Sequence, residues 1–268
     1  MIDGDGVGES TGRRLETDGG TAPETYAEFA AEADDEEPRF TDWLRARSEP
    51  DWTDAVGHPF TRELGAGTLS EEAYAEYLVQ DYAFVGDLVG TFGHAVGQAP
   101  GMASKRPLVE FLDTITDEEN DYFERSFDAL EVADTRQTDP ELAEPTAAFV
   151  DLLGRAAAEG GYAETLAVLV PAEWIYEGWA TAVAAEYADP DREPPSAGTD
   201  LPFYYAEWID LHATPGFREF VDWLRGELDA VGPELSARRQ ARVERLFRRT
   251  VSLEVAFFDS AYESTDSR

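Results

Sequence analysis

GTLSEEAYAEYLVQDYAFVGDLVGTFGHAVGQAPG, residues 67–101, is the stretch that decides the fold class. Ser70 is a preferred residue before a helix, and the acidic Glu71 and Glu72 suit the positive end of a helix dipole. Large apolar side chains then recur every three or four residues, the period of an amphipathic helix. They are Tyr74, Tyr77, Leu78, Phe84, Val85, Leu88 and Phe92. The pattern predicts one long helix that ends at the Pro-Gly pair 100–101.

Helical periodicity continues through the rest of the chain, and strand-like alternation is rare. One or two helices are expected between Tyr26 and Glu49. The other expected helices cover about 104–130, 145–159, 162–187, 202–212, 215–231 and 233–263. Pro233 stands where the last of these is expected to begin. Because several helices are apolar on more than one face, we predict an all-α, compact bundle of seven to nine helices around a central helix.

The N-terminal segment differs in composition from the rest. Residues 1–22 have almost no large apolar side chains, so they are expected to form a disordered acidic tail before a single helical domain, residues 23–264. The opening residues lack the apolar run of a secretory signal. No segment has the roughly 18–20 uncharged apolar residues of a membrane span. These features predict a cytoplasmic protein without a membrane partner.

The charge is strongly acidic, with 57 acidic against 21 basic residues and a net charge of −36, and Lys105 is the one lysine. Such a surface repels phosphates, which argues against nucleic-acid partners. At about 1 M salt the Debye length falls to about 3 Å, so repulsion between carboxylates is screened. We therefore expect a protein from a halophile.

The side chains that commonly bind metals are scarce. The absence of cysteine excludes disulfides, thiolate metal sites and cysteine nucleophiles. The three histidines, His58, His94 and His212, lie far apart, and none has the spacing of a metal motif. We expect no metal and no cofactor, with His58 as a structural cap or turn residue.

Three carboxylates interrupt strongly apolar helices: Asp81, Glu173 and Glu254. Burying an unpaired carboxylate costs several kcal/mol, so such a residue needs a partner or a task. One interpretation is that each bonds an arginine or a backbone amide between two helices. The other is a shared site, because each carboxylate has an aromatic residue one turn further on the same face. Aromatic walls with acidic groups would suit a flat, nitrogen-rich ring.

Three blocks resemble a known family. HPFTRELGAGTLSEEAYAEYLVQDYAFV (58–85), AETLAVLVPAEWIYEGWA (163–180) and SLEVAFFDSAY (252–262) are similar, in order and spacing, to blocks of the TenA (thiaminase II) family. The resemblance covers about residues 40–263. It implies a haem-oxygenase-like helical fold, usually without haem, and hydrolysis of thiamine or of its pyrimidine breakdown products.

The resemblance also implies roles for single residues. Asp81 matches the aspartate that holds the amino group and ring nitrogen of the pyrimidine. Glu254 matches the glutamate that handles protons at the reacting centre, and Tyr176 matches a supporting tyrosine. Ala172 stands where many members have a nucleophilic cysteine. Its neighbour Glu173 resembles the glutamate of the cysteine-lacking branch, which is associated with aminopyrimidine salvage.

Further substrate contacts are expected from Phe84, where many relatives have tyrosine, and from His212, where the cysteine branch often has tyrosine. Phe149 and Glu177 complete the expected substrate-binding set. Removing the amine from an aminomethyl group requires a proton donor and activation of water. We expect Glu173 and Glu254 to divide these tasks, with Asp81 as the anchor of the ring; the sequence leaves open which glutamate is the acid.

Two alternatives to an aminopyrimidine hydrolase stay open at this point. An oxidase on the same fold, with a di-iron centre, would need inward histidines at helical spacing, and the histidines are scattered. A regulatory protein could bind the pyrimidine or thiamine without turnover, although no segment resembles a helix-turn-helix and the charge opposes DNA contact. From the resemblance alone, a homo-oligomer, dimer or tetramer, is expected.

Overall fold

The computed structural model describes residues 22–33, 38–187 and 201–266, and all regular structure within these ranges is helical. The predicted all-α class is therefore confirmed. The helices are α1 (Tyr26–Glu32), α2 (Phe40–Arg47), α3 (Asp51–Val56), α4 (Pro59–Ala66), α5 (Glu71–Gln98), α6 (Met102–Thr114), α7 (Asn120–Ala129), α8 (Asp134–Thr138), α9 (Glu144–Glu159), α10 (Tyr162–Tyr187), α11 (Phe203–Ala213), α12 (Pro215–Val231) and α13 (Ala237–Asp266). The predicted tail lies, except for Ala22, outside the described residues.

The prediction of seven to nine helices was too low for two physical reasons. Helices such as α3 and α8 have only six and five residues, too few to show an apolar period. In addition, the expected helix 104–130 is divided, because a π-helical segment at Ile115–Glu119, η1, separates α6 from α7. No helix within the described ranges has the length and apolar character needed to cross a membrane.

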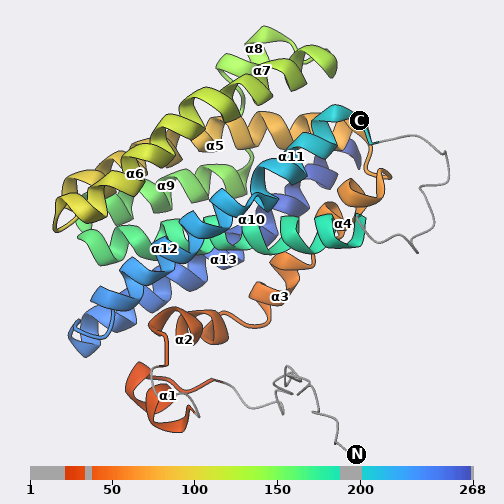
Figure 1. Cartoon of the computed structure of the whole chain (residues 1–268). Coiled ribbons are helices and arrows are strands. Elements are labelled where there is room, and N and C mark those ends of the chain that lie inside the picture. The colour runs from red at the N-terminus through yellow and green to blue at the C-terminus, as the bar shows by residue number, and fades with distance from the viewer. Residues whose placement is uncertain (1–21, 34–37, 188–200, 267–268) are drawn as a thin grey trace, which may run out of the picture.

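Helix α10 is the centre of the bundle. Residues 163–176 are all buried, which agrees with a sequence that is apolar on every face of the helix. The helix packs against α5, α9, α11, α12 and α13, and Figure 1 shows these long helices running around it while α1 to α3 lie at one side. A side chain on α10 can therefore meet side chains from several helices at once.

Two helix starts follow the predicted capping chemistry. The Ser70 hydroxyl accepts a hydrogen bond from the backbone N–H of Ala73 at 3.2 Å, as expected for the residue before α5. His58 precedes α4, and its Nδ1 accepts the N–H of Phe60 at 3.2 Å. The prediction of a structural role for His58 is confirmed.

The predicted start of the last helix at Pro233 was wrong. Helix α13 begins at Ala237, and a turn precedes it in which the N–H of Leu235 donates to the Gly232 carbonyl at 3.2 Å. The ring of Phe40 lies against Gly232, where a Cβ would collide with it. A side chain larger than hydrogen is therefore excluded at the residue that follows α12.

Candidate active site

The three carboxylates selected from the sequence come together inside the bundle. Asp81 comes from α5, Glu173 from α10 and Glu254 from α13, and their exposed fractions are 2%, 6% and 1%. The charges of Asp81 and Glu173 both raise the pKa of Glu254, and the charge of Asp81 raises that of Glu173. Three helices that are distant in sequence thus contribute to one acidic cluster.

Burial dominates the electrostatics of this cluster because it penalises the charged form of each acid. It raises the pKa of Asp81 to about 7, while hydrogen bonding to Tyr77 and Tyr176 offsets part of the rise. Burial and then the charge of Asp81 raise the pKa of Glu173 to about 8. The pKa of Glu254 lies well above its usual value, from burial first and then from both neighbours. Near neutral pH the site therefore retains protons that exposed carboxylates would have lost.

The arrangement differs from the structural interpretation in which each carboxylate pairs with an arginine. Across the described ranges, none of the three forms an ion pair with a basic side chain. Oδ2 of Asp81 and Oε1 of Glu254 are buried without a hydrogen-bond partner among the described residues. Unpaired buried oxygens of this kind are costly unless a ligand bonds to them.

A hydrogen-bonded chain of aromatic side chains supports the cluster. The indole Nε1 of Trp208 donates to the Tyr77 hydroxyl at 3.2 Å, and that hydroxyl lies 2.7 Å from the Tyr176 hydroxyl. Both hydroxyls also interact with Asp81. The chain connects α11, α5 and α10, and it fixes the Tyr176 hydroxyl beside Asp81.

Apolar rings lie beside the same acids. Phe84 is one turn from Asp81 on α5, and its ring centroid is 4.6 Å from that of Phe149 on α9. Phe257 of α13 is 6.1 Å from Phe84. The predicted contacts Phe84 and Phe149 are therefore neighbours, and together they can form an apolar wall beside a planar ring that is hydrogen-bonded to Asp81.

His212 lies next to Tyr176, with 5.0 Å between the ring centroids. Its Nδ1 is 2.9 Å from the Trp208 carbonyl, so the proton sits on Nδ1. Burial lowers its pKa to about 4. The imidazole is consequently neutral at pH 7, and Nε2 can accept a hydrogen bond.

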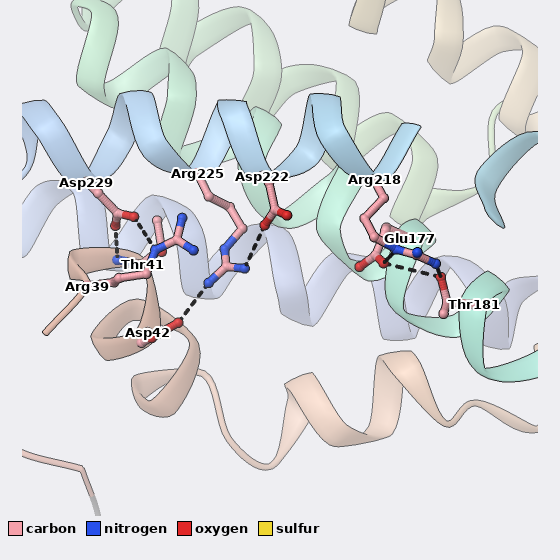
Figure 2. Close-up of polar contacts among 9 residues, drawn as sticks. All are labelled: Arg39, Thr41, Asp42, Glu177, Thr181, Arg218, Asp222, Arg225 and Asp229. Carbon is pink, nitrogen blue, oxygen red and sulfur yellow. Dashed lines mark hydrogen bonds and ion pairs between the residues drawn. The ribbon is translucent and has the colours of Figure 1, made fainter. Parts of the chain in front are cut away.

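Glu177 is the predicted site residue that the structure places elsewhere. Its Oε1 accepts hydrogen bonds from Nε of Arg218 at 3.3 Å and from the Thr181 hydroxyl at 3.2 Å. Figure 2 shows this group between α10 and α12, along the same face as the Arg225 contacts. The carboxylate that was expected to meet substrate instead joins two helices, so its position does not support a substrate contact.

Glu119 was missed by the sequence analysis. It ends the π-helical segment η1, and burial, then the charges of Glu173 and Asp81, raise its pKa well above the usual value. The residue as a whole is only partly buried, so its carboxyl group faces the interior while other atoms meet solvent. The sequence did contain a signal for an inward position of Glu119. This residue is four positions from both Ile115 and Phe123, which are buried, and side chains at this spacing share a helix face. Single π-helical turns are frequent at functional sites.

The local sequence of α10 explains what stands beside Glu173. Pro171 lies inside the helix and has no N–H, so the carbonyl one turn earlier loses its usual partner. Ala172, where the resemblance implies a cysteine in other members, is 3% exposed and presents only a methyl group. The next residue on the helix is the buried Glu173. Within the described parts of the chain, no three His, Asp or Glu side chains are arranged to hold a metal ion.

Comparisons with known proteins agree with this architecture. The chain is 27% identical over 219 residues to the aminopyrimidine aminohydrolase of Halalkalibacterium halodurans, covering 82% of this chain and 93% of the relative. It is 28% identical over 224 residues to the aminopyrimidine aminohydrolase of Helicobacter pylori, covering 83% and 98%. A TenA family transcription regulator from a Silicibacter species shares the fold, with a TM-score of 0.72, 22% identity and 84% and 97% coverage. The TENA/THI-4/PQQC family model matches residues 45–264, and the chain belongs to this family.

Proposed function

We propose that this protein is an aminopyrimidine aminohydrolase of thiamine salvage. It replaces the side-chain amine of 4-amino-5-aminomethyl-2-methylpyrimidine, or of its formyl derivative, with a hydroxyl group. The observation that carries the proposal is the cluster of Asp81, Glu173 and Glu254: it is buried, it has no ion pair within the described ranges, and its pKa values are raised. Two relatives with that enzyme name, each covered over more than nine-tenths of its length, support the choice of substrate class.

Asp81 is the proposed anchor of the ring. A carboxyl group can accept a hydrogen bond from the exocyclic amine and, when protonated, donate one to the adjacent ring nitrogen. Its Oδ2 has no hydrogen-bond partner among the described residues, and its pKa of about 7 makes both protonation states accessible at neutral pH. Phe84 and Phe149, which pack against each other, would form one apolar wall beside the same ring.

Glu254 and Glu173 are the proposed acid and base. The reaction adds water to the methylene carbon, breaks its bond to nitrogen and releases ammonia, so the departing nitrogen gains a proton and water loses one. Burial raises the pKa of both glutamates, and two carboxylate charges add to this rise at Glu254 but only that of Asp81 at Glu173. We therefore assign the proton donor to Glu254, where two neighbouring charges favour the protonated form, and the acceptor to Glu173.

The decisive experiment measures ammonia release from the aminomethylpyrimidine in high salt. The wild-type protein should release ammonia from this substrate. The Glu173→Gln variant should have a kcat lower by about 10²-fold or more, as expected when a general base is lost. Glu177→Gln is the matched control on the same helix, because that carboxylate bonds Arg218, and it should stay within about threefold of wild type. Undiminished turnover by Glu173→Gln would overturn the assignment of the base. Binding without turnover by wild type would indicate a regulatory protein, and iron that is required for activity would indicate an oxidase.

The wider setting is also part of the proposal. The net charge of −36 supports a cytoplasmic enzyme of a halophile, and residues 23–264 are proposed as one domain within a homo-oligomer. Activity that rises with KCl towards molar concentrations would support the halophilic setting, because screening removes carboxylate repulsion. Sedimentation at the same salt concentrations would show a dimer or tetramer if the oligomer forms.

A further inference from the structure

The first half of α13 is basic in an otherwise acidic protein. Six arginines lie within twelve residues of this helix, while the whole chain has 21 basic residues and a net charge of −36. They are Arg238, Arg239, Arg242, Arg245, Arg248 and Arg249. The stretch precedes Glu254 on the same helix, and the proposed reaction does not use it.

Four of these arginines line one hollow on the surface. The hollow has a volume of about 610 Å³ and lies between the start of α13 and the Gly160-Gly161 turn before α10. Its lining residues are Glu159, Gly160, Gly161, Glu164, Arg238, Arg239, Arg242 and Arg245. The volume is in the range of small-molecule sites.

An ion pair fixes one side of the hollow. Arg239 donates from Nε and Nη2 to the two carboxylate oxygens of Glu164, at 3.0 and 2.6 Å. The carboxylate of Glu164, a side chain 3% exposed, also accepts the N–H of Gly161 at 3.1 Å. A Cβ on Gly160 would lie 2.5 Å from Cβ of Glu164, so glycine is required for this close packing. The pair holds the start of α13 against the start of α10.

Three arginines around this fixed pair remain available. Within the described ranges, Arg238, Arg242 and Arg245 have no acidic partner, although the chain has 57 acidic residues. Most other arginines in the described ranges do pair with carboxylates, as do Arg39, Arg47, Arg106, Arg125, Arg136, Arg218 and Arg225. The lining of the hollow therefore has four arginines against two glutamates, and three of the arginines form no ion pair within the described ranges.

We propose that this hollow binds a pyrophosphate group, either free or at the end of a nucleotide. Guanidinium groups bind phosphate oxygens with paired N–H donors, and three of them match a ligand with several negative charges. Positions 238 to 245 span roughly 10 Å along the helix, so one phosphate could not contact all three. A long polyanion is disfavoured because it would leave the hollow and meet the acidic surface.

The test is calorimetric titration of the full chain with inorganic pyrophosphate and, separately, with ATP, at constant ionic strength set with KCl. Wild type should show saturable binding, and Arg238→Gln/Arg242→Gln should weaken it at least about 100-fold, at roughly tenfold for each charge-assisted contact. Arg106→Gln/Arg249→Gln removes the same charge outside this hollow and should leave the affinity within about threefold. Tighter binding of ATP than of pyrophosphate would identify a nucleotide as the source of the group, and equal binding would identify pyrophosphate alone.

Several results would overturn the proposal. One is the absence of saturable heat with both ligands, and another is an equal loss of affinity in both double variants, which would mean general charge attraction only. A third is self-association that Arg238→Gln/Arg242→Gln abolishes in the absence of ligand. That result would show that the arginines meet the acidic surface of a second copy instead. Circular dichroism of each variant would verify that the helices are retained.

Discussion

Replacing Glu173 with glutamine is expected to remove a pH-dependent cost of folding. Burial and the charge of Asp81 raise the pKa of Glu173 from 4.5 to about 8, so between these values the folded protein holds a proton that the unfolded chain has lost. The stability that Glu173 contributes by binding this proton is therefore complete below pH 4.5. It is lost as the pH rises through about 8. Glutamine keeps the shape and stays uncharged, so the variant lacks this dependence.

The magnitude follows from the size of the shift. A rise of about 3.5 in the pKa corresponds to about 5 kcal/mol in the free energy of unfolding, at 1.36 kcal/mol per unit. About 3 kcal/mol of this free energy is lost between pH 5.5 and pH 8. For a chain of this size 1 kcal/mol changes Tm by about 2–4 °C. The Tm of wild type should thus fall by roughly 10 °C more than that of Glu173→Gln over this interval.

The assay is thermal unfolding followed by circular dichroism from pH 5.5 to pH 9 in 2 M KCl. Exposed carboxylates are ionised in both folded and unfolded states above about pH 5.5. His58 and His212, whose pKa burial lowers, contribute equally to both proteins, so the difference between the two profiles reports Glu173. Glu177→Gln is the control, because Glu177 pairs with Arg218 on the same helix, and its profile should parallel that of wild type. A Glu173→Gln profile that also runs parallel to wild type would refute the reasoning.

Other substitutions test the supporting structure. Tyr77→Phe removes a hydroxyl that lowers the pKa of Asp81, so the limb of the pH–activity profile governed by Asp81 should move to higher pH; an unchanged profile would contradict this role. Gly65→Ala would drive a methyl group into Val183 and should cost about 1–3 kcal/mol in the free energy of unfolding. Gly86→Ala, at a helical glycine with nothing near its Cβ position, should instead stabilise by up to about 1 kcal/mol, as denaturant titration would show.

The long helices and the acidic cluster could be predicted because both depend on local apolar context. An acid flanked by large apolar residues on a helix tends to face the core, so Asp81, Glu173 and Glu254 could be selected without knowing the topology. The limits of α10, residues 162 and 187, were predicted correctly because glycines precede it and its apolar run is long. The all-α fold class followed from the same helical periodicity, which extends over long stretches of the chain.

Other features depend on packing that a single sequence does not display. Glu177 has the same apolar setting as Glu173, but whether it meets substrate or an arginine depends on α12, which supplies Arg218. Glu119 lies in a polar run, and its inward carboxyl depends on a π-helical turn that changes the phase of the helix. The arginines of α13 resemble a solvated helix face in sequence; the hollow that they line also requires the Gly160-Gly161 turn.

The cost of burying the acids and the proposed chemistry have the same origin. Burial raises the pKa of each of these acids; the charge of Asp81 raises it further at Glu119, Glu173 and Glu254, and the charge of Glu173 does so at Glu119 and Glu254. These raised pKa values weaken the fold as pH rises. They also keep a protonated acid available at neutral pH, which the departing amine requires. A substrate that brings an ammonium group among these acids favours their ionised forms, so Glu173 becomes a base when the substrate is bound. Removing one acid should therefore stabilise the empty protein and slow the reaction, and the two effects measured on Glu173→Gln test one electrostatic cause.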